Sequence, residues 1–232
     1  MNFTKYRFGL FFILVLVAVT LLSSCGILGA VSGMGTAERN EPISSGEADA
    51  QYNVDDDGFT NFGFGSYKEA NGWIFEPKYA EMEGRTPAEK RYYIMDGVTP
   101  TQRYASNISI EVGSNRYSPE EHLRFRDGIL SSLGAQTRGA EVTIGASGSN
   151  TSNGYVLYEF SIDMEDADGP DTTQYYVVGD QKYFLIIATD FHDPGVSLES
   201  IKKALDEIAN SFVWNDLEPV ADSEHSKQAL LP

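Results

Sequence analysis

A charge-free apolar run near the N-terminus limits what the rest of the chain can fold into. Residues 8–22 contain no charged side chain, and Lys5 and Arg7 precede them without an acidic residue. A basic segment followed by an apolar segment of this length is typical of a secretory leader. It is short for a membrane-spanning helix, which needs about 20 apolar residues. We therefore predict that residues 1–24 are a signal peptide and take no part in the folded domain.

The only cysteine of the chain lies directly after this run. Leu22, Ser23 and Ser24 precede Cys25, and this sequence resembles the lipobox of bacterial lipoproteins. The resemblance implies that the Cys25 thiol is diacylglycerylated, that cleavage falls between Ser24 and Cys25, and that the acylated cysteine becomes the N-terminus. The alternatives are a cleaved secretory signal or an uncleaved anchor that happens to end in cysteine. Because each buried methylene contributes about 0.8 kcal/mol, two or three lipid chains hold a protein firmly on a membrane.

The residues after Cys25 predict where the protein is located and how it is tethered. Gly26 follows the cysteine in place of an aspartate, so nothing resembles an inner-membrane retention signal. We expect the extracytoplasmic face of the cell membrane, or the outer membrane if the cell has one. Residues 26–58 are rich in Gly, Ala, Ser, Glu and Asp without a hydrophobic period, which is typical of a flexible tether. A tether of about 33 residues has a root-mean-square reach of roughly 30 Å.

The acidic composition limits the kinds of partner. The chain has 34 Asp and Glu against 17 Lys and Arg, a formal net charge of −17. A surface of this sign repels phosphate backbones and anionic lipid headgroups, which argues against nucleic-acid binding and against electrostatic docking on a membrane. One cysteine also excludes an internal disulfide framework and a multi-cysteine metal site. Contact with the membrane is therefore expected through the lipid on Cys25.

The folded part is predicted to begin at Phe59 and to mix strands with helices. Strands are predicted from apolar alternation over residues 59–64, 73–75, 92–95, 107–112, 142–144, 155–163 and 173–178. Residues 183–188 are apolar at every position, which indicates a strand covered on both faces. Gly179 and Asp180 are predicted to form a two-residue hairpin turn. Residues 77–90 and 145–154 are predicted to be loops, and residues 217–232 a disordered tail.

Two helices are predicted. Ser118-Pro119-Glu120-Glu121 is a capping box with proline at the first helical position. This first helix should end at Gly134, and its apolar face consists of Leu123, Phe125, Ile129, Leu130 and Leu133. The second helix should begin after Ser197, and its apolar residues at helical spacing are Leu198, Ile201, Ala204, Leu205, Ile208, Ala209 and Phe212. A strand covered on both faces then requires a helix on each side of the sheet, or a helix on one side and loops on the other.

The order of these elements resembles the PsbP-like fold, an α/β/α sandwich with a central antiparallel sheet. The resemblance covers residues 59–214 and rests on Gly72-Trp73 before an early strand, the hairpin at Gly179-Asp180 and residues 208–214 closing the last helix. It implies an α+β fold class with a central antiparallel sheet flanked by helices; an unrelated two-layer α+β sandwich is the alternative. The predicted domain spans residues 59–216.

The family includes an extrinsic subunit of the oxygen-evolving complex and bacterial lipoproteins, so the resemblance implies a non-enzymatic accessory or binding function. The plant members assist manganese and calcium retention, but no motif of this chain carries that chemistry over. The long segment 77–90 also departs from the compact family pattern. We therefore predict a lipoprotein that binds another protein of the cell envelope.

The acidic residues and the histidines are the candidates for a metal site. Placing Gly169 at position 6 of an EF-hand loop puts Met164 at position 1 and Tyr175 at position 12, so the calcium-loop pattern fails. A looser calcium site could use Asp166, Asp168 and Asp171, which leaves cation or small-ligand binding as the alternative function. The three histidines lack the spacing of zinc ligands, and they are His122, His192 and His225. No metal site and no cofactor are predicted.

Catalytic motifs are sought and none is found. Residues 145–149 lack the second glycine of a nucleophile elbow, and Gly63-Phe64-Gly65 does not continue as a phosphate-binding loop. A pair of carboxylates of the glycosidase type forms only in the fold, so an envelope hydrolase is the least favoured alternative. The remaining candidate is an aromatic binding surface, as opposed to rings packed within the strands, formed by Tyr92, Tyr93, Tyr155, Tyr175 and Tyr176.

Overall fold

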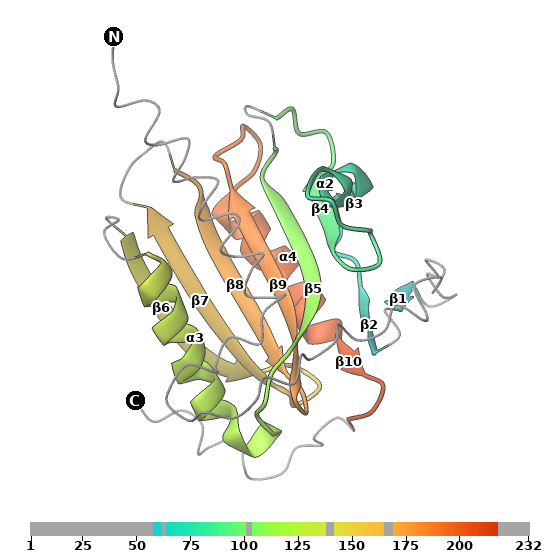
Figure 1. Cartoon of the computed structure of the whole chain (residues 1–232). Helices are drawn as coiled ribbons and strands as arrows, with labels where there is room; N and C mark the ends of the chain where they lie inside the picture. The colour runs from blue at the N-terminus through green and yellow to red at the C-terminus, as the bar shows by residue number, and fades with distance from the viewer. Residues whose placement is uncertain (1–57, 62–63, 101–103, 138–141, 165–168, 218–232) are drawn as a thin grey trace.

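A seven-stranded antiparallel sheet is the centre of the domain (Figure 1). The computed structural model describes residues 58–61, 64–100, 104–137, 142–164 and 169–217. The strand order is β3-β4-β5-β9-β8-β7-β6, and all neighbours are antiparallel. These strands are β3 (Trp73–Phe75), β4 (Arg91–Met95), β5 (Asn107–Ser114), β6 (Val142–Asn150), β7 (Val156–Met164), β8 (Asp171–Val178) and β9 (Lys182–Asp190).

A small three-stranded antiparallel sheet lies beside it, in the order β1-β2-β10. Its strands are β1 (Phe59–Asn61), β2 (Gly65–Lys68) and β10 (Val213–Trp214). The sequence did not predict β2 as a separate strand or β10 as a strand, because segments of four and two residues carry too little periodicity. The beginning and the end of the described domain are therefore joined through β2.

The two long helices cover opposite faces of the large sheet, which is the first of the two arrangements predicted from the fully apolar strand. These are α3 (His122–Gln136), which follows the short 3-10 helix Pro119–Glu121, and α4 (Leu198–Ser211). Residues packed under α4 form one core cluster and residues packed under α3 form another. We call these sides the α4 face and the α3 face. The predicted α+β class, a central antiparallel sheet flanked by helices, is confirmed.

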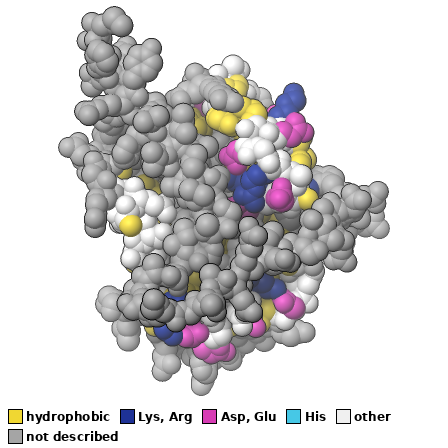
Figure 2. Space-filling view, in the orientation of Figure 1, with side chains coloured by type: hydrophobic (Ala, Val, Ile, Leu, Met, Phe, Trp, Pro, Cys, Tyr) yellow, Lys and Arg dark blue, Asp and Glu magenta, His cyan; other side chains and the backbone are white. Residues whose placement is uncertain are grey.

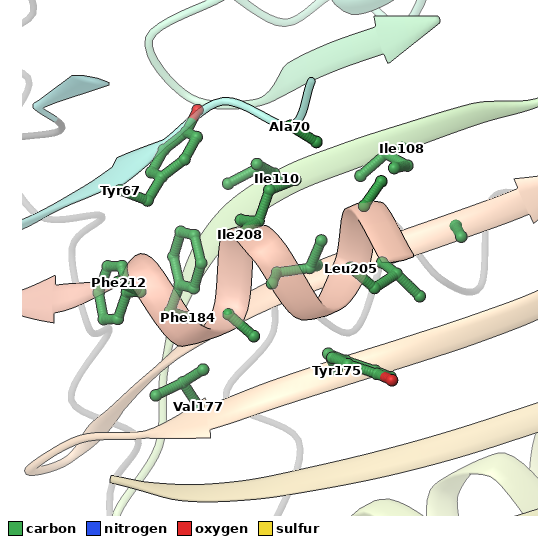
Figure 3. Close-up of a cluster of buried hydrophobic side chains, with 14 of the residues drawn as sticks. Tyr67, Ala70, Ile108, Ile110, Tyr175, Val177, Phe184, Leu205, Ile208 and Phe212 are labelled. Carbon is green, nitrogen blue, oxygen red and sulfur yellow. The ribbon is translucent and has the colours of Figure 1, made fainter. Parts of the chain in front are cut away.

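The α4 face has an aromatic and aliphatic core (Figure 3). Ser197 caps α4, since its hydroxyl accepts from the Ser200 N–H at 3.1 Å. Phe212 at the end of the helix stacks on Phe184 of β9 with ring centroids 3.9 Å apart. The predicted apolar residues of α4 are buried with one exception, Leu198 at the first helical position, which is 67% exposed.

On the α3 face, the predicted capping box is present but the predicted end of the helix is wrong. The Ser118 N–H points to a Glu121 carboxylate oxygen at 3.5 Å. The helix continues through Gly134, which adopts helical geometry with open space around it. It ends when Thr137 donates its N–H and its hydroxyl to the Leu133 carbonyl. Leu123, predicted to be on the apolar face, is 48% exposed.

Two predicted loops and one turn also differ from the structure. The segment 77–90 contains the helix α2 (Pro77–Met82), and β6 extends to Asn150 through a stretch predicted as loop. In the β8–β9 hairpin, the Gly179 N–H donates to the Lys182 carbonyl, so the two turn residues are Asp180 and Gln181. Gly179 is instead required by close packing, because a Cβ there would lie 2.8 Å from the Trp214 ring.

The predicted leader, the lipobox with Ser24 and Cys25, and the tether up to residue 57 lie outside the described residues. Leu217 is described and packs against the core of the α4 face, whereas residues 218–232 are not described. Within the described ranges, no helix combines the length and the apolar character that crossing a membrane requires.

Candidate functional site

The tyrosines proposed as a binding surface lie inside the domain, so that prediction is wrong. Their exposed fractions are 5% or less, and the residues are Tyr92, Tyr93, Tyr155, Tyr175 and Tyr176. Adjacent tyrosines point to opposite faces, as expected of a strand. Both faces are covered, however, by α4 on one side and by α2 and α3 on the other. The sequence pattern could not show that a second layer covers each face.

The buried hydroxyls of these tyrosines are hydrogen-bonded within the protein. Tyr176 donates to the Gln174 side-chain oxygen at 2.8 Å, and Tyr155 donates to the Leu217 carbonyl at 2.8 Å. Burial raises the pKa of Tyr176 well above its ordinary value. These side chains therefore stay neutral and structural, because a phenolate would be expensive in the interior.

The histidines and the acidic segment do not come together as a metal centre among the described residues. Asp166 and Asp168 lie outside the described residues, whereas Asp171 begins β8 directly opposite Asp190 of β9. His192 lies near both carboxylates, with nitrogen–oxygen distances of 4.0 Å to Asp171 and 3.8 Å to Asp190. Its backbone is in the left-handed region, with φ of 59°. A positive charge at this histidine would offset the like charges of two aspartates placed opposite each other.

His122 is on the α3 face, away from that cluster. Its Nδ1 lies 2.6 Å from the Tyr158 hydroxyl, and the two rings are stacked. Burial, and to a smaller extent the charge of Arg126, lowers the pKa of His122. The neutral ring therefore serves packing at neutral pH.

One hollow of the described surface lies beside α4 and combines an apolar floor with charged side chains. It has a volume of about 310 Å3 and lies where α4 passes the ends of β3 and β4. We call it the α4 hollow. Its lining residues are Asn71, Gly72, Trp73, Met95, Asp96, Ser200, Lys203, Ala204 and Glu207.

The floor of the α4 hollow is apolar because its residues belong to the edge of the hydrophobic core on the α4 face. Trp73 and Ala204 are 6% and 2% exposed, and Met95 packs partly buried against the same cluster. Trp73 and Met95 are direct cross-strand partners in the β3–β4 pair. The floor can therefore receive an aliphatic or aromatic group without a change in the strands beneath it.

The rim of the α4 hollow is charged, with an excess of acid. Glu207 accepts the Asn71 backbone N–H at 3.1 Å, which fixes the turn against the helix. The exposed Lys203 is 3.8 Å from the partly buried Glu207, one helical turn away. Asp96 is exposed and makes no ion pair among the described residues. Two carboxylates and one ammonium group leave the rim negative overall, which favours a basic occupant.

Two glycines and a backbone hydrogen bond hold the strand ends of the hollow. Gly72 adopts φ of +79° and Gly97 adopts φ of +77°, which glycine allows without strain. The Asp96 N–H donates to the Gly72 carbonyl at 2.9 Å, so the two turns face each other. The sequence contained one signal for this site, the turn at Asn71-Gly72. It contained no signal that the turn meets a helix more than a hundred residues later.

Described side chains of both charge signs lie on the side of the molecule seen in Figure 1. In Figure 2, the described basic and acidic side chains on this side lie next to one another and are not gathered by sign. Two ion pairs join the segment after α2 to its surroundings, Lys90–Glu83 at 3.2 Å and Arg85–Glu111 at 2.7 Å. Charges paired within the domain are less available to a partner, which favours the α4 hollow as the candidate site.

No protein-family model matches the chain, and no curated protein does. Among solved structures, the chain is similar to the solution structure of a cyanobacterial PsbP protein, CyanoP, from Synechocystis. The TM-score is 0.38 and the identity 16%, over 68% of this chain and 87% of that one. This is the family that the element order resembles. At this TM-score the likeness carries no argument about function.

Proposed function

We propose that the protein is a lipoprotein anchored through Cys25 on the extracytoplasmic side of a membrane, and that its domain is a non-enzymatic binding module. The partner is another envelope protein that offers a basic segment to the α4 hollow. The observation that carries this proposal is the apolar floor of Trp73, Met95 and Ala204 within a negative rim.

Charge complementarity identifies the occupant. The methylenes of a lysine or arginine side chain can lie on the apolar floor while its cationic head reaches Asp96 at the rim. The whole chain carries a net charge of −17, so the same sign of field also draws a basic partner toward the surface. A neutral or acidic segment would leave Asp96 without a counter-charge.

Crosslinking in intact cells tests the binding site. A photoreactive residue placed at Ser200, on the rim, should capture an envelope protein, whereas one placed at exposed Glu120 should not. Asp96→Lys should lower the captured yield about tenfold, as the loss of about 1.4 kcal/mol of binding would. Asp180→Lys changes the net charge equally in an exposed turn and is the matched control. Equal yields from the two lysine variants would refute the α4 hollow as the site.

The anchor is tested separately. In Cys25→Ser the thiol that would carry the lipid is removed, so we expect loss of lipid labelling and either release from membranes or a chain with its leader uncleaved. A Cys25→Ser chain that is cleaved normally and remains on membranes would refute lipidation at this residue. Neither result depends on the outcome at the α4 hollow.

Cation binding is the second candidate function, and one observation favours it. Asp171 and Asp190 lie opposite each other on neighbouring strands, where a cation would reduce their repulsion. A bound ion would raise the melting temperature through linkage. Our proposal predicts no change in the melting temperature at millimolar calcium, and a rise that Asp171→Asn abolishes would favour the cation-binding function instead.

A further inference from the structure

Among the strands that the structure describes, β6 is a long edge of the large sheet with a paired neighbour on one side only. It is last in the strand order, and all nine of its residues are paired with β7 in one uninterrupted register. The other edge strands of the described sheets are much shorter, with three residues in β3, three in β1 and two in β10. In Figure 1, β6 forms the side of the sheet opposite β3. Only β6 therefore has room for a full additional strand.

The hairpin that joins β6 to β7 shows which backbone groups face outward. The Thr151 N–H donates to the Tyr155 carbonyl at 2.9 Å, so this pair is hydrogen-bonded. Hydrogen-bonded pairs alternate along an antiparallel ladder, so the odd-numbered residues of β6 bond to β7. The N–H and C=O groups that point away from the sheet consequently belong to the even-numbered residues, which are Val142, Ile144, Ala146, Gly148 and Asn150.

The β6 edge lacks the devices that usually protect an edge strand. Proteins block such edges with charges, prolines, bulges or short strands. Residues 142–150 contain no charged residue and no proline, and their register with β7 shows no bulge. Ala146, Ser147, Ser149 and Asn150 are exposed. An unprotected edge of this length is a template for strand addition.

We propose that a second copy of this chain occupies the edge, with the two β6 strands antiparallel about a two-fold axis at Ala146. This register pairs residue 146 with itself and residue 144 with residue 148, and every outward backbone group of the strand then gains a partner. Ile144 lies opposite the partner's Gly148, and Thr143 lies opposite the partner's Ser149. Each pair combines a larger with a smaller side chain or places two hydroxyls together, which suits close contact between strands.

The self-complementary register favours a second copy over an unrelated strand, and the charge distribution shows where two copies can meet. Two molecules that each carry a net charge of −17 repel at most points of contact. The neutral strand β6 is the place where copies approach with the least repulsion. The two-fold register also requires no residue outside β6, as expected of an isologous interface. The proposal is independent of the α4 hollow, which is on the other side of the sheet order, beside β3 and β4.

Single cysteines in the full-length chain test the register. In membranes treated with a mild oxidant, Ala146→Cys should give a disulfide-linked dimer, because the opposed Cα atoms of a hydrogen-bonded pair are about 5.5 Å apart. Thr143→Cys and Ser149→Cys should each remain monomeric alone and should crosslink when the two variants are co-expressed. Glu81→Cys, exposed on α2 at the far end of the sheet, is the control position. The unsubstituted chain reports any crosslinking through Cys25.

Three outcomes would overturn the proposal. The first is a dimer yield from Ala146→Cys no greater than from Glu81→Cys. The second is an Ala146→Cys product with the mass of a different protein, which would assign the edge to another partner. The third is crosslinking of Thr143→Cys alone as efficiently as in the mixture, which would show random collision. Pairing of β6 with another segment of the same chain would leave Ala146→Cys monomeric, and so would also refute it.

A charge at the two-fold axis provides a second test that does not depend on cysteine chemistry. Ala146 is exposed, so Ala146→Lys should fold with an unchanged melting temperature. The yield of its crosslinked dimer should fall at least tenfold, because two lysines would lie directly opposite each other. Co-expression with Ala146→Glu should restore a mixed dimer in chemical crosslinking. A dimer of Ala146→Lys as abundant as that of the unsubstituted chain would contradict the two-fold register.

Discussion

The two sides of β5, an inner strand of the large sheet, bury different kinds of residue. On the α4 face, β5 contributes Ile108 and Ile110 to an apolar core that includes the stacked rings of Phe184 and Phe212. On the α3 face, the same strand buries Ser109 and Glu111 at exposures of 3% and 0%. One strand therefore supplies a nonpolar side and a polar side, and both are removed from solvent.

The difference shows that buried polar residues need hydrogen-bond or ion-pair partners, whereas buried apolar residues need only close packing. Glu111 is tied to Arg85, in the segment after α2, at 2.7 Å. Gln174, fully buried on the same face, accepts from Tyr176 but its amide nitrogen has no hydrogen-bond partner among the described residues. At β5, the side toward α4 is held by nondirectional packing, whereas the side toward α3 depends in part on specific hydrogen bonds and charge pairs.

The largest expected effect is on the apolar side of the comparison. Phe184→Ala removes a fully buried ring that stacks on Phe212, and we expect the free energy of unfolding to fall by about 3–5 kcal/mol. Phe125→Ala, on the α3 face, should cost less because α3 buries two of its residues against five in α4 and can adjust more easily to the lost ring. Urea unfolding of both variants measures the difference. An equal or greater loss for Phe125→Ala would contradict the ranking of the two faces.

The contribution of the polar side to stability can be tested at its ion pair between Arg85 and Glu111. Arg85→Ala removes a charged hydrogen-bond partner of the buried Glu111, and we expect a loss of about 1.5–3 kcal/mol in the free energy of unfolding. Arg124→Ala removes a guanidinium from the exposed pair with Glu121 and should cost about 0–1 kcal/mol. If thermal unfolding shows the same loss for the two variants, the pair at Glu111 is no more important than a surface contact.

Replacing glycine by alanine should have opposite effects on stability at Gly179 and at Gly134. Gly179→Ala places a methyl group 2.8 Å from the Trp214 ring on the α4 face, and should destabilise by about 1–3 kcal/mol. Gly134→Ala meets open space within α3, and should stabilise by about 0.5–1 kcal/mol because alanine favours a helix. Thermal melts decide both signs, and a stabilising Gly179→Ala would show that the ring can move aside.

The smallest expected effect is a pH dependence on the α3 face. Burial lowers the pKa of His122 in the folded state, so the unfolded chain takes up the proton first as the pH falls through the ordinary value of about 6.5. Protonation of His122 therefore lowers the free energy of unfolding in acid, and His122 has no such effect above that pH range. The free energy of unfolding should decrease more for the unsubstituted chain than for His122→Gln between about pH 7.5 and about pH 5. Parallel decreases would show that His122 is protonated equally in both states.

The same contrast explains how much of the fold could be predicted from the sequence. The helix α4 was predicted closely because its apolar residues repeat at helical spacing and Ser197 caps it. The strand β9 was predicted to be covered on both sides because it has no polar face. In β5 the alternation was correctly read, but the side with Ser109 and Glu111 is buried, since periodicity reports polarity and not the presence of a covering layer.

The errors at β6 and at the candidate site also have physical causes. The glycines and serines of β6 have low strand propensity, and its pairing with β7 outweighs that preference. Gly145 and Gly148 fit because a Cβ would lie 2.4 Å from the Ser161 side chain and 3.0 Å from the Tyr158 ring. The α4 hollow joins residues 71–73, 95–96 and 200–207, and such long-range proximity leaves no local pattern in a single sequence.

The small sheet has a mechanical consequence for a domain pulled from its N-terminal end. The strand β1 pairs with β2 over three residues, and β2 pairs with β10 over two. A force applied ahead of Phe59 would reach these short antiparallel pairs first, whereas the large sheet is loaded through the contacts of β2 with α4 and through the hydrogen bond between the Tyr67 and Tyr93 hydroxyls. The small sheet would act as a weak link that yields first and reforms, leaving the core of the domain intact under transient load.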